Sequence, residues 1–111
     1  MGFCRALRAG DRVLISGTAP VWPDGSVDPD PYVQAGRCFE IIERALQEAG
    51  ASIGQVVRTG MFITDTAYAD AVGRAHGEVM AAARPTATMV VVKALLDERW
   101  KVEIEAEAVM S

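Results

Sequence analysis

The spacing of hydrophobic and polar residues predicts two helices and five strands along the chain. Apolar side chains recur at helical spacing between Pro31 and Gly50, where Asp30 can cap the helix start and Gly50 can end it in a left-handed conformation. A second run with helical spacing covers 67–82. Short apolar or alternating runs predict strands over 3–9, 12–19, 55–64, 87–93 and 101–109.

This order of elements, β-β-α-β-α-β-β, indicates an α+β fold in which both helices pack on one face of a mixed sheet. The chain has 111 residues, so we expect a single domain over 1–111. Between the second strand and the first helix, residues 20–31 are dense in proline, aspartate and glycine. This composition is typical of a surface loop, with a tight turn at Asp24-Gly25.

The strand at 87–93 carries apolar residues on both of its faces, as Val90 and Val91 illustrate. We interpret it as a central strand, whose two faces both need a cover. The two helices cover one face. The other face, which includes Met61 or Phe62 of the neighbouring strand, is predicted to be covered by another copy of the chain.

Composition narrows the function classes. The formal net charge is −4, and the lysines are few (Lys93 and Lys101), so the chain lacks the basic stripe of a nucleic-acid surface. No apolar run approaches the ~20 residues of a bilayer span. Cys4 and Cys38 lie outside any CxxC or Cys/His cluster, which argues against a metal site. We expect a cytoplasmic protein with reduced thiols, no metal, no cofactor, and neither nucleic acid nor membrane as partner.

Candidate catalytic residues are few. The single histidine, His76, lies on the second predicted helix, where a packing or surface role is commoner than that of a base. The pair Ser16-Gly17 ends a predicted strand. Two interpretations of this pair stay open: a backbone amide that meets an anionic ligand, or an ordinary glycine bulge.

The last predicted strand alternates strictly between apolar residues and the glutamates Glu103, Glu105 and Glu107. A strand in a half-covered sheet has this pattern, with its polar face in solvent. We therefore expect Glu105 and Glu107 to be solvated and to have no function. Glu103 lies deeper along the strand and is treated as a candidate site residue.

Several segments occur in register along the chain and together cover nearly all of it. They are Gly10–Pro20, Ala45–Ser52, Val56–Asp65, Arg84–Val92 and Val102–Val109. In this order they resemble the YjgF/RidA family, also called the L-PSP or endoribonuclease-like family. The resemblance implies a chorismate-mutase-like fold and a homotrimer whose sheets form a central barrel, with small-molecule clefts between subunits. It also implies kinship with deaminases that hydrolyse imines and enamines to a 2-keto acid and ammonia.

The resemblance also assigns site residues. The glutamate of the family's final strand matches Glu103, which becomes the catalytic candidate, and the arginine that clamps the substrate carboxylate falls on Ala87. The family's tyrosine, asparagine and cysteine positions hold Phe3, Gly73 and Met89 instead. The implied ligand-binding residues are Phe3, Ser16, Gly17, Gly73, Ala87, Met89 and Glu103.

The alanine at position 87 opens alternatives. A lost charge-assisted contact costs about 1.5–3 kcal/mol, and it leaves Glu103 without an evident cation, unless Arg58 or a neighbouring subunit's arginine substitutes. We therefore expect a trimer whose unidentified ligand is neutral or cationic, rather than a standard imine deaminase. Glu103, flanked by Met89 and Phe3, then serves either as an acid–base group or merely as a partner for backbone amides. The alternatives are a 2-imino acid or enamine deaminase, a hydrolase of imine-like C–N bonds, with a displaced cation, and a non-catalytic structural or partner-binding trimer.

Overall fold

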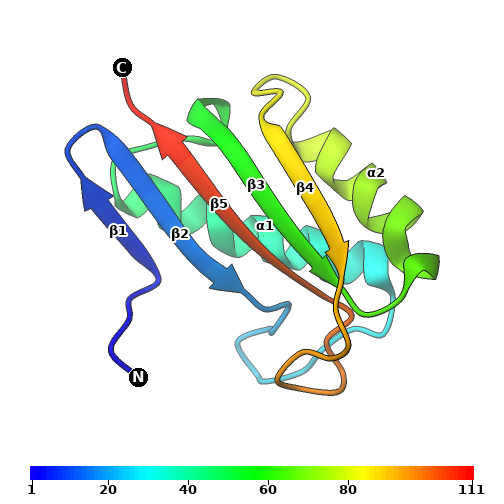
Figure 1. The fold of residues 1–111 in the computed structure, drawn as a ribbon. Coiled ribbons are helices and arrows are strands. Elements are labelled where there is room, and N and C mark those ends of the chain that lie inside the picture. The colour runs from blue at the N-terminus through cyan, green and yellow to red at the C-terminus, as the bar shows by residue number, and fades with distance from the viewer.

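The computed structural model describes residues 1–111 and shows a twisted sheet with two helices on one face (Figure 1). The strands are β1 (Ala6–Ala9), β2 (Arg12–Thr18), β3 (Val56–Ile63), β4 (Thr86–Val91) and β5 (Val102–Val109). The helices are α1 (Pro31–Glu48) and α2 (Ala69–Val79), with short 3-10 turns at Ile53–Gln55 and Thr66–Tyr68. The predicted α+β class, element order and single helical layer are confirmed.

Both ends of α1 follow the predicted capping. The Asp30 carboxylate accepts a hydrogen bond from the Tyr32 backbone N–H at 2.8 Å, and Pro31 occupies the first helical position. At the other end Gly50 follows the C-cap with a φ of +91°, a conformation that a side chain disfavours. Local sequence therefore fixes the length of this helix.

Replacement of Asp30 by alanine is expected to lower the free energy of unfolding by about 1 kcal/mol, because the N-cap hydrogen bond is lost. Urea unfolding measures this change. Glu43→Ala is the matched control, since Glu43 is exposed in the middle of α1. Equal losses in the two variants would contradict the capping role of Asp30.

The sheet is mixed, with the strand order β1-β2-β5-β3-β4. β4 runs parallel to β3, and the other neighbouring strands are antiparallel. The prediction that the strand at 87–93 is central was therefore wrong, because β4 is an edge strand. Its residues Val90 and Val91 remain 41% and 52% exposed. Apolar residues on both faces of a strand indicate that both faces are covered. They do not indicate whether the strand lies at the edge or in the centre of the sheet.

The core lies between the sheet and the helices. Its largest fully buried apolar side chains are Phe39, Ile42, Leu46, Ile63, Ile104, Val13, Val56, Val72 and Val102. His76 of α2 packs edge-on against Phe39, with ring centroids 5.8 Å apart, and its Nε2 lies 2.8 Å from the Thr59 hydroxyl. This arrangement confirms a packing role for His76, and burial lowers its pKa. Neither helix has the length and apolar character that a membrane crossing requires.

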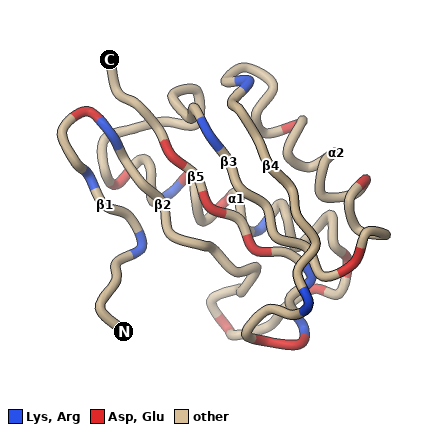
Figure 2. The backbone as a smooth tube through the Cα atoms, viewed as in Figure 1, with Lys and Arg blue, Asp and Glu red and all other residues tan.

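The sheet face opposite the helices has no cover within the chain (Figure 1). The register puts Phe62 beside Glu103 and Val90 beside Phe62, all on this open face. Met61 instead faces the helices and is 3% exposed, so Phe62 is the residue of β3 that the open face includes. Figure 2 shows acidic residues spaced along β5, the central strand of the sheet.

Candidate functional site

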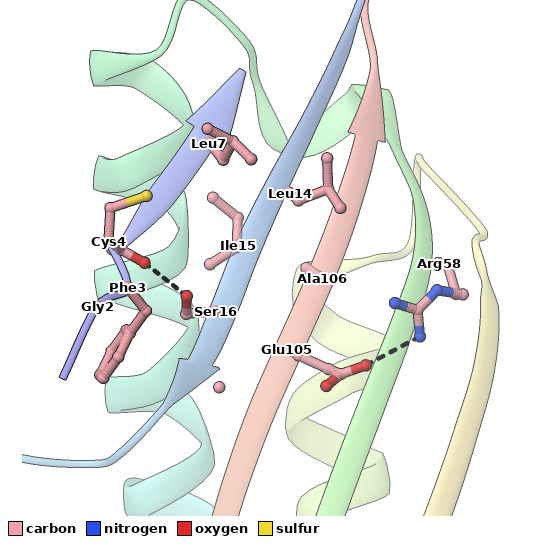
Figure 3. Close-up of a pocket in the computed structure, with 11 residues that line it drawn as sticks. Gly2, Phe3, Cys4, Leu7, Leu14, Ile15, Ser16, Arg58, Glu105 and Ala106 are labelled. Carbon is pink, nitrogen blue, oxygen red and sulfur yellow. Dashed lines mark hydrogen bonds and ion pairs between the residues drawn. The ribbon is translucent and has the colours of Figure 1, made fainter. Parts of the chain in front are cut away.

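Three glutamates project from β5 onto the open sheet face, and arginines neutralise two of them. Glu107 pairs with Arg12 of β2 at 2.6 Å. Glu105 pairs with Arg58 of β3 at 3.1 Å, as Figure 3 shows. The side chains of Glu107 and Glu105 are 15% and 34% exposed, so the expectation that both are simply solvated was wrong. Cross-strand neighbours supply a cation that the alternating pattern of one strand cannot reveal.

Glu103 has no ion-pair partner within 4 Å. Partial burial raises the pKa of its carboxyl above the ordinary value, and the negative charge of Glu105 adds to this effect. The positive charge of Arg5 opposes the rise in the pKa of Glu103. Glu103 is therefore the glutamate of this face that has no arginine partner, and its carboxyl keeps a proton to a higher pH than an ordinary carboxyl does, because its pKa is raised.

A β-bulge in β2 holds the Glu103 carboxyl close to the backbone. Ile15 pairs with Ala106 and Thr18 with Ile104, so β2 contains one residue more than β5 over this stretch. A Cβ at Gly17 would lie 2.9 Å from Glu103 Oε2, so any other residue at this position would push the carboxyl aside. The glycine-bulge interpretation of Ser16-Gly17 is thus confirmed.

Arg5 is a charged neighbour of the bulge that the sequence analysis did not identify. It is exposed and lies just before β1, where its carbonyl accepts a hydrogen bond from the Ser16 N–H at 3.0 Å. Its Nη1 donates to the Thr18 hydroxyl at 3.3 Å, which brings the guanidinium to the bulge that borders Glu103. The charge of Arg5 influences Glu103 without an ion pair between them, and the expectation that Glu103 has no cation in its ligand cleft stays a prediction. The sequence predicted that residues 3–9 pair with 12–19. It did not predict that the long Arg5 side chain extends along the neighbouring strand as far as Thr18.

A pocket of about 550 Å³ opens on the same face, beside the bulge (Figure 3). Its lining combines the N-terminal segment with β1, β2, β3 and β5, and includes Phe3, Ser16 and Gly17 of the predicted site. The Ser16 hydroxyl donates to the Cys4 carbonyl at 2.6 Å and fixes the N-terminal segment along the rim. Phe3 is 69% exposed. Glu103 lies at the Gly17 end of this pocket, outside its lining.

The remaining predicted residues do not join this group within one chain. Ala87 and Met89 pair with Thr59 and Met61, whose buried side chains face the helices. Ala87 and Met89 therefore point to the side of the sheet opposite Glu103. Met89 packs against the core of its own chain, so it does not flank Glu103 within one chain, and its place beside Glu103 in a cleft between subunits stays a prediction.

Gly73, the last predicted residue, lies in α2 on the helical side of the sheet, with open space around its Cα where a side chain would be.

The alternation of residues along β4 predicts that Ala87 and Met89 share one face of the sheet. The pairing of β4 with β3 is needed to show that this face is the one covered by the helices. No group of three or more His, Cys, Asp or Glu side chains is arranged to hold a metal ion.

Comparison with known proteins supports one family throughout the chain. The family model described as Endoribonuclease L-PSP matches residues 1–110. Uncharacterized protein SCO2049 of Streptomyces coelicolor is 40% identical over 108 residues, which cover 96% of this chain and 81% of that protein. The 2-iminobutanoate/2-iminopropanoate deaminase of Salmonella typhimurium is 32% identical over 111 residues, covering 96% of this chain and 86% of the enzyme.

Similar solved structures support the same family. The crystal structure of Rv2704 from Mycobacterium tuberculosis, a member of the YjgF/YER057c/UK114 family, is similar with a TM-score of 0.90 and 36% sequence identity. The similarity covers 98% of this chain and 87% of Rv2704. With the fold, the bulge and the final-strand glutamate in place, this chain belongs to the L-PSP (YjgF/RidA) family.

Proposed function

We propose that this protein is a homotrimer that binds a small imine or enamine in clefts between its subunits and hydrolyses the C–N bond, with Glu103 as the acid–base residue. One observation carries the proposal. Glu103 is the glutamate of the open face that has no arginine partner, and burial raises the pKa of its carboxyl. The deaminase activity in the name of the Salmonella relative supports the reaction class.

The chemistry needs one group that gives a proton and takes one back. The protonated Glu103 carboxyl donates to the imine nitrogen while a water molecule adds to the imine carbon, and the resulting carboxylate accepts the proton that the water loses. The carbinolamine then releases ammonia and leaves a carbonyl product. A raised carboxyl pKa suits this role, because both protonation states are then accessible closer to neutral pH than for an ordinary carboxyl.

Two features support assembly with further copies of the chain. The edge strand β4 exposes the apolar side chains of Val90 and Val91 beside a row of unpaired backbone groups, which proteins normally cover. The open sheet face has no cover of its own. In such an assembly Ala87 and Met89 of one subunit can face the Glu103 of another, so the predicted site residues would meet across an interface.

Light scattering and an imine assay test the proposal on the wild-type protein. We expect a mass of three times the 11.9 kDa chain. We also expect hydrolysis of 2-iminopropanoate, generated in situ from alanine by an amino acid oxidase, above its spontaneous rate. Semicarbazide traps the imine that remains. A monomeric protein would contradict the assembly, and a rate equal to the uncatalysed one would contradict the reaction.

Ligand binding without turnover is a second candidate, favoured by the alanine at position 87, which has no side chain to clamp a carboxylate. A ligand that binds only the folded protein raises its melting temperature. A thermal shift with neutral amines or keto compounds, together with an inactive imine assay, would identify this case.

A further inference from the structure

A groove runs between α1 and α2 on the surface of the helical layer. The two helices pack against each other, and cavities of about 250 and 230 Å³ open along their junction. Gly36, Glu40 and Val79 line both cavities, so the two cavities form one groove. The helices cover the sheet face opposite the one that carries Glu103 (Figure 1). The groove therefore lies apart from the site of the proposed reaction.

The two cavities lie one helical turn apart along α1. Residues of α1 between Tyr32 and Glu40 line the first cavity, and residues between Gly36 and Glu43 line the second. One turn of an α-helix rises about 5.4 Å, and side chains four positions apart on a helix are separated by about this distance. A partner helix that lies along the groove can therefore place one side chain in each cavity.

The walls of the groove are largely apolar and include aromatic rings. Trp22 and Tyr32 line the first cavity, Phe39 lines the second, and Val79 of α2 lines both. A Cβ built on Gly36 meets no atom within 4 Å, so the missing side chain leaves open space in the groove. The transfer of an apolar side chain from water into such a cavity is favourable.

The charge that α1 presents along the groove is negative. The Arg37 guanidinium stacks over the Trp22 ring, 4.6 Å from its centroid, and its Nε donates to the Val21 carbonyl at 3.0 Å. The Arg37 side chain is only 18% exposed, whereas that of its ion-pair partner Glu40 is 60% exposed. Glu43 is exposed and has no ion-pair partner within 4 Å. Arg37 thus directs its charge toward its own chain, and the two glutamates face solvent.

The α2 side of the groove adds a third carboxylate. Glu78 lines the first cavity and accepts a hydrogen bond from the Tyr32 hydroxyl. Arg74 stacks over the Tyr32 ring, 4.2 Å from its centroid, and lies outside the lining of the groove. The lining therefore holds three carboxylates and one guanidinium. An apolar floor with an acidic rim complements a helix that carries lysine or arginine beside an apolar stripe.

We propose that this groove is a docking site for a basic amphipathic helix of a partner protein. The helix inserts two apolar side chains, one turn apart, into the two cavities, and its lysines or arginines lie beside Glu40 and Glu43. Recognition of an amphipathic helix in an apolar groove is a recurring mode of protein binding. This inference does not rest on the proposed function, because no residue that lines the groove belongs to the Glu103 site.

Synthetic helices test the proposal. The probe is a fluorescein-labelled, alanine-based peptide with two leucines four positions apart and lysines on both sides of them. One control peptide replaces the leucines by alanine, and the other replaces the lysines by glutamate. Fluorescence anisotropy measures the binding of each peptide to the full chain and to two variants. Gly36→Leu fills the groove. Gly77→Leu is its matched control, since Gly77 is also a helical glycine with open space around it but lies outside the groove.

We expect the wild type to bind the lysine–leucine peptide and to bind each control peptide at least about tenfold more weakly. The alanine control loses the apolar contacts, and the glutamate control is repelled by Glu40 and Glu43. Gly36→Leu is expected to weaken binding of the lysine–leucine peptide at least about tenfold without lowering the melting temperature, because leucine favours a helix more than glycine does. Its rate of imine hydrolysis should equal that of the wild type. Gly77→Leu should bind the peptide as the wild type does.

Four results would overturn the docking site. They are no binding of the lysine–leucine peptide by the wild type at about 1 mM, equal binding of the glutamate peptide, undiminished binding by Gly36→Leu, and equal weakening by Gly36→Leu and Gly77→Leu. A change of mass caused by Gly36→Leu in light scattering would also overturn it, because another copy of the chain would then cover the groove. None of these results bears on the function proposed for Glu103.

Discussion

Replacement of Glu103 by glutamine is expected to lower kcat/KM for imine hydrolysis by about 10²–10⁴-fold, the contribution typical of a general acid–base residue. Glutamine preserves the size of the side chain and its fit against Gly17, but it cannot exchange a proton. The imine assay with 2-iminopropanoate measures the loss. Glu107→Gln is the matched control, because Glu107 lies on the same strand and face but pairs with Arg12. Equal losses in both variants would contradict a chemical role for Glu103.

Stability separates a chemical role of Glu103 from a structural one. Burial raises the pKa of this carboxyl in the folded protein above its ordinary value of 4.5. Its contribution to stability is therefore fully present below that value and is lost as the pH rises through the folded-state pKa. In urea unfolding, we expect the wild type to lose stability relative to Glu103→Gln as the pH rises from the ordinary value of 4.5 through the raised folded-state pKa. A variant that is markedly less stable at neutral pH would indicate a structural carboxylate.

Replacement of Gly17 by alanine is expected to reduce imine hydrolysis by about 10²-fold, because a catalytic group displaced by an ångström loses that much. The added Cβ would lie 2.9 Å from Glu103 Oε2. The carboxyl is the end of a flexible side chain and moves aside more easily than the backbone of the bulge does. The fold should therefore survive while the position of the catalytic oxygen does not, and the same imine assay measures the result.

A second glycine provides the control for Gly17. Gly77 is exposed in α2, and a Cβ there meets no atom within 4 Å. Gly77→Ala should keep full activity and gain up to about 1 kcal/mol of stability from the better helix propensity of alanine. Full activity in Gly17→Ala, with the carboxyl unmoved in its crystal structure, would sink the argument that the bulge positions Glu103.

The ion pairs beside the site influence specificity more than stability. An exposed pair such as Arg58 with Glu105 contributes at most about 1 kcal/mol. By pairing with Arg12 and Arg58, however, Glu107 and Glu105 leave Glu103 as the glutamate of the open face that has no arginine partner. The arginines of the neighbouring strands β2 and β3 thus determine which carboxylate of the open face stays unpaired.

The sequence by itself determined the elements and their outward faces. Asp30 and Gly50 mark the ends of α1, and the alternation of 102–109 puts three glutamates on one side of β5. Such signals act between residues a few positions apart, where capping bonds and side-chain periodicity depend on local backbone geometry. The order of the sequence motifs along the chain also indicates the family and the candidate residue Glu103, and this inference needs no knowledge of strand pairing.

The tertiary structure alone decided which of these residues meet. It placed β4 at the sheet edge, turned Ala87 and Met89 away from Glu103, and brought Arg5 to the bulge. Strand order, register and side-chain reach depend on contacts between residues far apart in the chain, which a local pattern does not encode. Arg5, which precedes β1, and Glu103 of β5 both approach the bulge, although they lie 98 positions apart in the chain and β2 lies between their strands.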